Sequence, residues 1–418
     1  MRILILNQSF YPDIVSAAQH ASDLASALVE EGHAVTVVAS RRAYTDRHTC
    51  FPARETWRGC DVRRVFSLGL EKTGKWGRIL DSAILLAAFL RELIRLPRFD
   101  VVLAMTHPPM VAFLAALITR IKGGRLVSWV MDLNPDEAIA AGWLRAESLA
   151  ARVLNWALVS SLRASLMIVV LDRFMLARIE GKGIPPENIV VIPPWAHDKT
   201  VRYDAAGRAE FRAAHGLADK FVVMYSGNLS PVHPLDTLLH AAARLGNRND
   251  IRFCFIGGGN ALPAVQQFFQ ERHLETLVCL PYQPLSRLGA SLSAADLHLV
   301  TMGDSMVGIV HPCKIYSILT LGVPFLHIGP GENHLSEIAK SLGTPGASYH
   351  ARHGDIDGVV NAIVEAASRN PGTVEELRRA SAPFSQGVLI PKFIRILEEV
   401  VAEERPHMAV HLTGEQAE

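Results

Sequence analysis

The sequence predicts an α/β protein built from two doubly wound domains, each a parallel sheet covered by helices on both faces. Short β-branched or apolar runs alternate with helical patterns along most of the chain, which is typical of parallel sheets. The alternation forms two series, and the polar, glycine-containing stretch 199–220 separates them. Open sheets of this kind bind ligands at the carboxyl ends of their strands, so two such domains facing one another would enclose a cleft.

The first series of elements precedes residue 199. Its clearest helical patterns lie at 16–31 and 109–121, where apolar residues recur at helical spacing. Its apolar, β-branched runs predict strands over 3–6, 34–39, 62–66, 101–104, 125–131, 167–171 and 189–192. These elements are sufficient for one complete doubly wound domain.

The second series follows the same plan. Its predicted strands are 221–225, 251–256, 277–280, 297–300 and 324–328. Its predicted helices are 235–245, 261–272, 285–294 and 312–321. A second parallel sheet with its own covering helices therefore follows the first.

The composition supports globular domains and argues against several other classes of protein. Of the 418 residues, 49% are hydrophobic and 20% are charged, so a large core is possible and global disorder is excluded. A net charge of +1 argues against a dedicated nucleic-acid binder. The five cysteines include no CxxC pair, which favours a reducing compartment over a disulfide framework or zinc ribbon. We expect a cytoplasmic protein, since no signal-peptide core and no apolar span of ~20 residues is found.

One predicted helix, at 76–96, is both basic and strongly apolar. Arg78, Arg91 and Arg95 flank the apolar stretch 84–90. Such a helix can lie in an anionic membrane surface. An ordinary packed helix with a solvated charged edge explains the same pattern, so both interpretations stay open.

Signals for phosphate binding are concentrated in the second domain. Residues 7–12 after the first strand contain no GxGxxG, and no GxxxxGK[ST] occurs, which disfavours a nicotinamide, flavin or P-loop site. Gly227 and Asn228 end the first strand of the second domain, where glycine allows close approach of a ligand. Pro312 suits the first position of a helix, which puts Lys314 in its first turn. A cation there is favourable if a phosphate shares the site with free N–H groups; a surface lysine without a ligand is the alternative.

Several motifs follow one another in a characteristic order. They are GHAVTV at 32–37, WVMDLNPD at 129–136, IVVIPPW at 189–195, YSGN at 225–228, DTLL at 236–239, FIGGG at 255–259, PYQP at 281–284, SAAD at 293–296, PCKIY at 312–316 and GVP at 322–324. In this order and spacing the chain resembles the retaining glycosyltransferases of family 4 over nearly its whole length. These enzymes have the GT-B fold, in which two Rossmann-like domains face one another across a cleft. The chain is most similar to the bacterial branch that builds cell-surface polysaccharides, such as colanic acid and O-antigen.

The resemblance implies a role for each part of the chain. Residues 1–197 would form the acceptor-side domain, completed by the carboxyl-terminal helix 384–404. Residues 198–383 would form the nucleotide-sugar domain, and 405–418 a mobile tail. The reaction would move a sugar from a nucleotide diphosphate, most often UDP, to a lipid-linked saccharide or polysaccharide precursor. The basic helix would then hold the protein peripherally on the inner face of the plasma membrane.

The resemblance also implies roles for individual residues. Lys314 and Asn228 would stabilise the departing phosphate without a metal or a cofactor, with His233 and His311 as further candidates. Asp132 would orient the acceptor, with a role as general base as the weaker possibility, and His107 could line the same side. The remaining expected nucleotide ligands are Gly227, Gly257, Gly258, Gln283, Pro312, Cys313 and Ser317.

The sequence departs from the pattern of these relatives at two acidic positions. Many of them carry two glutamates before the Gly-x-Pro, and the corresponding positions here are Ile309 and Ser317. Two other functions therefore stay open at this point. The same scaffold serves nucleotide-sugar 2-epimerases, and a degenerate relative could be a non-catalytic binding subunit of a polysaccharide assembly complex.

Overall fold

The computed structural model describes residues 1–44, 48–69, 75–369 and 373–402. The predicted tail at 405–418 lies outside these ranges. The chain divides into two compact units. Unit 1 comprises Met1–Pro193, Gly308–His311 and Ile390–Glu418, and unit 2 comprises Pro194–Val307 and Pro312–Leu389.

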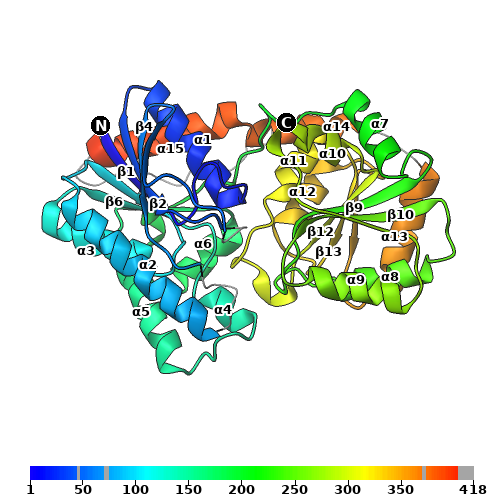
Figure 1. Cartoon of the computed structure of the whole chain (residues 1–418), viewed down its shortest axis with the longest axis horizontal. Helices are drawn as coiled ribbons and strands as arrows, with labels where there is room; N and C mark the ends of the chain where they lie inside the picture. Colours follow the sequence, from blue (N-terminus) through cyan, green and yellow to red (C-terminus); the bar gives the residue numbers. More distant parts are fainter. Residues whose placement is uncertain (45–47, 70–74, 370–372, 403–418) are drawn as a thin grey trace, which may run out of the picture. The chain divides into compact units, whose positions relative to one another are not determined.

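Unit 1 contains an eight-stranded sheet in the order β3-β4-β2-β1-β5-β6-β7-β8. Neighbouring strands are parallel except for the antiparallel pair β3 and β4. The strands are β1 Arg2–Leu6, β2 Ala34–Ser40, β3 Arg54–Trp57, β4 Cys60–Val65, β5 Val101–Ala104, β6 Arg125–Trp129, β7 Met167–Val170 and β8 Ile189–Val191. Near-continuous apolar sequence in β1 and β5 is expected, because helices cover both faces of the sheet (Figure 1).

The helices of unit 1, apart from the short α4, each bury one apolar face. They are α1 Ser16–Glu30, α2 Lys75–Arg95, α3 Val111–Lys122, α4 Asp136–Ala140, α5 Leu149–Ala164, α6 Arg173–Glu180 and the part of α15 (Gln386–Ala402) from Ile390 onward. In α2, Leu85, Phe89 and Leu93 recur at helical spacing and pack with α3 on the sheet. In α15, the Phe393 ring lies 4.7 Å from the ring of Trp129, which fixes this distant segment on the end of β6.

Unit 2 contains a parallel six-stranded sheet in the order β11-β10-β9-β12-β13-β14. The strands are β9 Phe221–Asn228, β10 Ile251–Gly258, β11 Leu277–Leu280, β12 Leu297–Thr301, β13 Phe325–Ile328 and β14 Ser348–Ala351. The helices are α7 Ala205–Ala214, α8 Asp236–Arg244, α9 Leu262–Glu271, α10 Leu288–Ser293, α11 Lys314–Leu321, α12 His334–Leu342, α13 Ile356–Arg369 and α14 Glu375–Ser381. Along β10, Phe253 and Phe255 join the core under α8 and α13, whereas Cys254 and Ile256 join the opposite core near α7.

The predicted strands and the basic helix are present, one prediction about a helix start was wrong, one predicted helix is present in two parts, and two strands were not predicted. Pro312 is not the first helical residue, because α11 begins at Lys314 and Cys313 is its N-cap. The helix expected over 285–294 is a 3₁₀ turn, Leu285–Arg287, followed by the short α10. The four-residue strands β3 and β14 were missed, since their polar sequences lack a clear apolar pattern. The long helix α2 is at the expected position, and no helix among the described residues is long and apolar enough to span a membrane.

Candidate active site

The first group of predicted site residues gathers at the carboxyl ends of β9 and β10 in unit 2. Gly227 and Gly257 are register partners on these strands, as are Asn228 and Gly258. Gly257 has a φ of +138°, and a Cβ there would collide with the carbonyl oxygen of Gly227. Only glycine allows the two backbones to approach this closely. Gly257 is buried against this neighbouring strand, whereas Gly227 is half-buried at the edge of the sheet.

Lys314, the first residue of α11, extends to the same edge. Its Nζ lies 3.6 Å from the centroid of the Tyr225 ring, and a Cβ on Gly227 would be 3.3 Å from that nitrogen. The Nζ is buried and has no hydrogen-bond partner among the described residues. Burial lowers the pKa of the amine to about 7. A buried amine with three unused donors is suited to an anionic ligand, because the anion supplies both charge and acceptors.

Two neighbours of Lys314 are held by backbone carbonyls. The Tyr225 hydroxyl donates to the carbonyl oxygen of Asn228 at 2.9 Å. His233 Nδ1 lies 2.9 Å from the carbonyl oxygen of Thr301, and a carbonyl only accepts, so Nδ1 carries the proton. Burial, followed by the charge of Lys314, lowers the pKa of His233 to about 3. His233 is therefore neutral, and its Nε2 is an acceptor that is not suited to bind a phosphate oxygen.

The other predicted nucleotide ligands of unit 2 lie on the surrounding turns. Cys313 and Ser317 are half-buried, and the Tyr316 N–H donates to the Cys313 carbonyl at 3.2 Å, so α11 starts with a tight turn. The N–H of Tyr316, one of those expected to be free to bind a phosphate, is thus already hydrogen-bonded within the first turn of the helix. Gln283 follows β11, and its Nε2 donates to the carbonyl oxygen of Pro281 at 2.9 Å. The intervening Tyr282 ring lies over Gly258, where an added Cβ would be 3.3 Å from it.

Unit 1 has a separate polar cluster near the carboxyl ends of β5 and β6. Asp132 lies in the turn after β6, and desolvation raises its pKa to about 6. Glu137, in the first turn of α4, has a pKa raised to about 7, first by burial and then by the charge of Asp132. His107 and Asn134 oppose this increase, Asn134 by donating to a Glu137 carboxylate oxygen at 3.3 Å. Both carboxyl groups therefore have pKa values raised above their usual range, and the charge of Asp132 contributes to the shift of Glu137.

Glu137 is a site residue that sequence reasoning missed. By sequence, Glu137 and the adjacent Asp136 are two acids in a first helical turn, where the helix dipole favours negative charge. In the structure Asp136 pairs with Lys182 at 2.9 Å, whereas Glu137 interacts with Asp132 and His107. Spacing alone does not tell which of two adjacent acids faces the sheet edge, because the answer depends on a lysine 46 residues away.

The segment Gly308–His311, which lies between β12 and α11 in sequence, belongs to unit 1. The Leu133 N–H donates to the Ile309 carbonyl at 2.9 Å, next to Asp132, and the Ile309 side chain is buried. His311 Nδ1 lies 2.7 Å from a carboxylate oxygen of Asp172, so the structure engages this candidate phosphate ligand in an ion pair. Burial raises the pKa of Asp172, but the hydrogen bond and charge of His311, with the N–H of Met175, outweigh it and lower the pKa overall.

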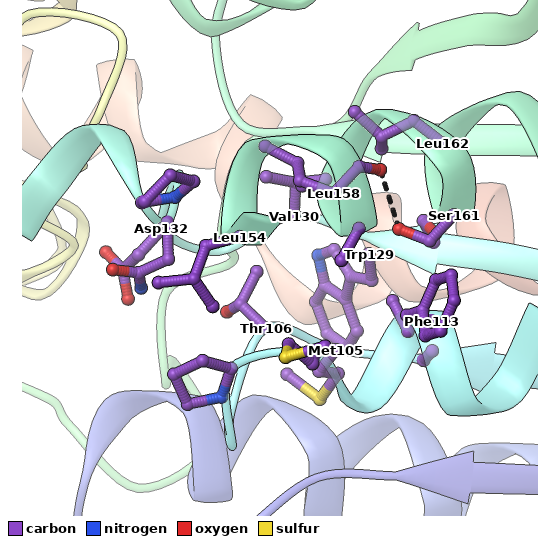
Figure 2. Close-up of a pocket in the computed structure, with 18 of the residues that line it drawn as sticks. Met105, Thr106, Phe113, Trp129, Val130, Asp132, Leu154, Leu158, Ser161 and Leu162 are labelled. Carbon is purple, nitrogen blue, oxygen red and sulfur yellow. Dashed lines mark hydrogen bonds between the residues drawn. The ribbon is translucent and has the colours of Figure 1, made fainter. Parts of the chain in front are cut away.

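A cavity of about 150 Å³ opens beside the polar cluster of unit 1. It lies between the ends of β5 and β6 and the helices α3 and α5. Figure 2 shows Asp132 at one end of the cavity and Phe113 and Leu162 at the other, with Trp129 and Leu154 between them. The cavity therefore joins a carboxylate to a largely apolar wall.

Comparisons with known proteins agree with this architecture. Residues 17–195 match the glycosyl transferase 4-like domain. WbjE of Pseudomonas aeruginosa, a protein named as a glycosyltransferase, is 25% identical over 313 residues, which cover 74% of this chain and 77% of WbjE. WcaI of Escherichia coli K12, named as a glycosyl transferase of colanic acid biosynthesis, is 21% identical over 380 residues, which cover 88% of this chain and 92% of WcaI.

A similarity to solved structures extends over both units. HepE of Anabaena, solved in complex with UDP and glucose, superimposes with a TM-score of 0.70 at 16% identity. The superposition covers 95% of this chain and 99% of that chain. Two parallel-sheet units with this similarity are Rossmann-like domains of the GT-B fold. Residues 17–195 thus match the glycosyl transferase 4-like domain, in a chain that has the GT-B fold.

Proposed function

We propose that the protein is a retaining glycosyltransferase that moves a sugar from a UDP-sugar to a lipid-linked saccharide or polysaccharide precursor. The name of WcaI supports a role in cell-surface polysaccharide synthesis. The complexes of HepE with UDP and with UDP-glucose support a uridine diphosphate donor. The donor would lie in unit 2, where Lys314 and the glycine pair form an anion-binding edge.

The observation that carries the proposal is the buried amine of Lys314, which has no hydrogen-bond partner among the described residues. Cleavage of the bond between the sugar C1 and the phosphate oxygen leaves negative charge on the departing UDP. A preorganised cation at that phosphate stabilises the transition state by about 2–4 kcal/mol, which corresponds to roughly 30- to 1,000-fold in rate. Gly227 is essential to this arrangement, because a side chain there would push against Lys314 Nζ.

In a single-step reaction, retention of configuration requires the acceptor oxygen to attack C1 from the same face that the leaving group leaves. The new bond joins C1 to the acceptor oxygen, the bond from C1 to the phosphate oxygen breaks, and the acceptor proton passes to that phosphate oxygen. No protein base is needed for this proton. Asp132 and Glu137 in unit 1 would instead orient acceptor hydroxyls, since a carboxyl group donates a hydrogen bond when it is protonated and accepts when it is ionised.

The outer face of α2 supports a peripheral membrane location for this activity. Ile79, Leu80 and Ile94 are exposed large apolar side chains on this helix, and Arg91 and Arg95 are exposed between and beside them. Exposed apolar and basic side chains on one helix favour an anionic lipid surface. We expect co-sedimentation with vesicles that contain anionic lipid, and a loss of it in Ile79→Asp/Ile94→Asp.

Release of UDP from a donor panel tests the function. UDP-, GDP-, dTDP- and ADP-sugars are incubated with a bacterial membrane lipid extract, with and without EDTA, and the free nucleotide is quantified. The proposal predicts release from a UDP-sugar that EDTA does not reduce, at least 30-fold less release with Lys314→Met, and unchanged release with the exposed matched control Lys340→Met. Equal rates in all three proteins would contradict the role of Lys314. Release from another nucleotide sugar alone would contradict the UDP assignment.

A further inference from the structure

The cavity of unit 1 is unusual in its chemistry. Its wall is built from Met105, Phe113, Trp129, Val130, Leu154 and Leu158. Its volume of about 150 Å³ is that of a site able to hold a benzene-sized group, so it accommodates about six carbon atoms. An apolar wall of this size favours a hydrocarbon ligand, because a bare sugar ring would leave its hydroxyls without partners there.

The serine hydroxyls in the apolar wall of the cavity are already hydrogen-bonded within the protein. On the apolar wall, the Ser161 hydroxyl donates to the Leu158 carbonyl at 2.7 Å, and Ser128 is hydrogen-bonded to Ser165 at 2.7 Å. Asp132 lies at the other end, and the hydroxyl of Thr106, which is buried and has no partner among the described residues, lies between Asp132 and Met105 (Figure 2). A ligand that fits both ends carries an apolar segment and a neutral hydroxyl-bearing group, since Asp132 and Glu137 repel an anion.

The cavity is close to an exposed apolar surface. The Phe113 ring, which lines the cavity, lies 5.2 Å from the ring of Trp156, and Trp156 is 59% exposed. Leu149 and Val153 on the same helix α5, and Leu117 and Ile121 on α3, are exposed as well. The cavity wall at Phe113 is thus in contact with an aromatic side chain of the exposed surface. A hydrocarbon chain that lies on this surface would have a short path into the cavity.

The lining of the cavity contains side chains that can adapt to a ligand. Met105 and Met110 both line it, and methionine fills irregular spaces through its flexible thioether. Met110 precedes α3 with a φ of +71°, a backbone conformation that a non-glycine residue rarely adopts. Such backbone strain is typical of ligand-binding positions.

We propose that this cavity binds a hydrocarbon segment of about six carbon atoms in the acceptor, with the hydroxyl-bearing part of the acceptor toward Asp132 and Thr106. The assignment of the occupant to the acceptor rests on the proposed function. The binding of an alkyl chain itself does not, because it requires neither a donor nor turnover.

Alkyl β-glucosides below their micelle concentrations test the proposal in calorimetric titrations. Methyl, butyl, hexyl and decyl glucoside are compared. Affinity is expected to rise about fourfold per methylene from butyl to hexyl, because each buried methylene has a fixed transfer free energy. It should level off at decyl, where the additional carbons find no space. Equal affinity for the methyl and hexyl compounds, or an increase that continues to decyl, would overturn the proposal.

Two variants on α5 separate the cavity from the exposed surface. Leu158→Phe fills the cavity and should weaken hexyl glucoside at least tenfold, whereas the exposed control Val153→Phe should bind as the wild type does. The reverse result would assign binding to the surface and contradict the proposal. UDP binding to both variants shows whether the nucleotide site of unit 2 is intact. Loss of alkyl-chain binding in the cavity can therefore be distinguished from loss of the proposed nucleotide binding.

A photoprobe keeps the test decisive if Leu158→Phe does not fold. A hexyl glucoside with a diazirine at its terminal carbon is cross-linked to the wild-type protein, and the labelled peptides are identified by mass spectrometry. We expect label on Phe113 or Leu162, at the end of the cavity opposite Asp132, competed by excess hexyl glucoside. Label only at the surface residues Leu117 and Ile121 would overturn the proposal.

Discussion

Replacing Lys314 by methionine should stabilise the ligand-free protein while it abolishes nucleotide binding. The amine has an ordinary pKa of 10.5, and burial lowers it to about 7 in the folded protein. Since one pKa unit corresponds to about 1.4 kcal/mol, the buried amine raises the free energy of the folded state by roughly 4 kcal/mol at pH 7. The contact of Lys314 Nζ with the Tyr225 ring offsets about 1–2 kcal/mol of this destabilisation, because a cation is attracted to the face of an aromatic ring.

The net expectation is that Lys314→Met raises the free energy of unfolding by about 2–3 kcal/mol at pH 7. The sign of the pH dependence follows from the lowered pKa. Between about pH 7 and pH 10.5 the unfolded chain holds more protons than the folded one, so the wild type gains stability as pH rises. The difference between the two proteins should therefore be largest at or below pH 7 and vanish near pH 10.5.

Urea denaturation of Lys314→Met, the wild type and Lys340→Met from pH 6 to pH 10 measures this difference. UDP should stabilise the wild type and Lys340→Met and leave Lys314→Met unchanged. A variant that is less stable than the wild type at pH 7, or a difference independent of pH, would refute the inference that Lys314 is held desolvated without a partner.

Three further predictions concern the nucleotide site, the backbone that supports it, and the Asp172–His311 pair of unit 1. UDP binding to the wild type should take up a proton above pH 7, because the phosphate favours the charged form of Lys314. Calorimetry in two buffers of different ionisation enthalpy detects this uptake. Its absence at about pH 8.5 would count against a contact between Lys314 and the phosphate. Gly257→Ala should destabilise unit 2 by more than about 3 kcal/mol, because both the φ of Gly257 and the Gly227 carbonyl exclude a Cβ. The control Gly216→Ala has a positive φ but open space around the added Cβ, so it should cost about 1 kcal/mol. Similar midpoints of the two variants in thermal denaturation would contradict this. Asp172→Asn should lower the free energy of unfolding by about 3 kcal/mol, because it leaves His311 without its carboxylate partner. Since the pKa of Asp172 is lowered in the folded protein, this stabilisation is present above about pH 4 and is lost as the pH falls further. Acid titration of both proteins would reveal the difference.

The periodicity of the sequence was sufficient to predict most strands and the two-sheet plan. Gly227 and Lys314 were singled out as a strand end and a helix start, and the structure brings their side-chain positions together. This proximity follows from parallel topology, because strand ends and the helix starts that follow them gather at one edge of a sheet. Local patterns therefore carry information about this part of the molecule.

The features that the sequence did not predict depend on contacts between distant residues. Asp172 and His311 are 139 positions apart, and nothing in either local sequence indicates that the segment Gly308–His311 belongs to unit 1. Glu137 and Asp136 differ in role only because Lys182 pairs with Asp136. The cavity of unit 1 likewise results from the packing of α3 and α5 over two strand ends, which residue spacing does not specify.

Calorimetric titration of UDP into the wild type, Lys314→Met and Lys340→Met, each with and without EDTA, tests the central claim most directly. The account predicts one UDP site in the wild type, unchanged by EDTA and by Lys340→Met, and at least 100-fold weaker binding in Lys314→Met. Wild-type affinity in Lys314→Met, or no binding of UDP to any of the three folded proteins, would contradict it.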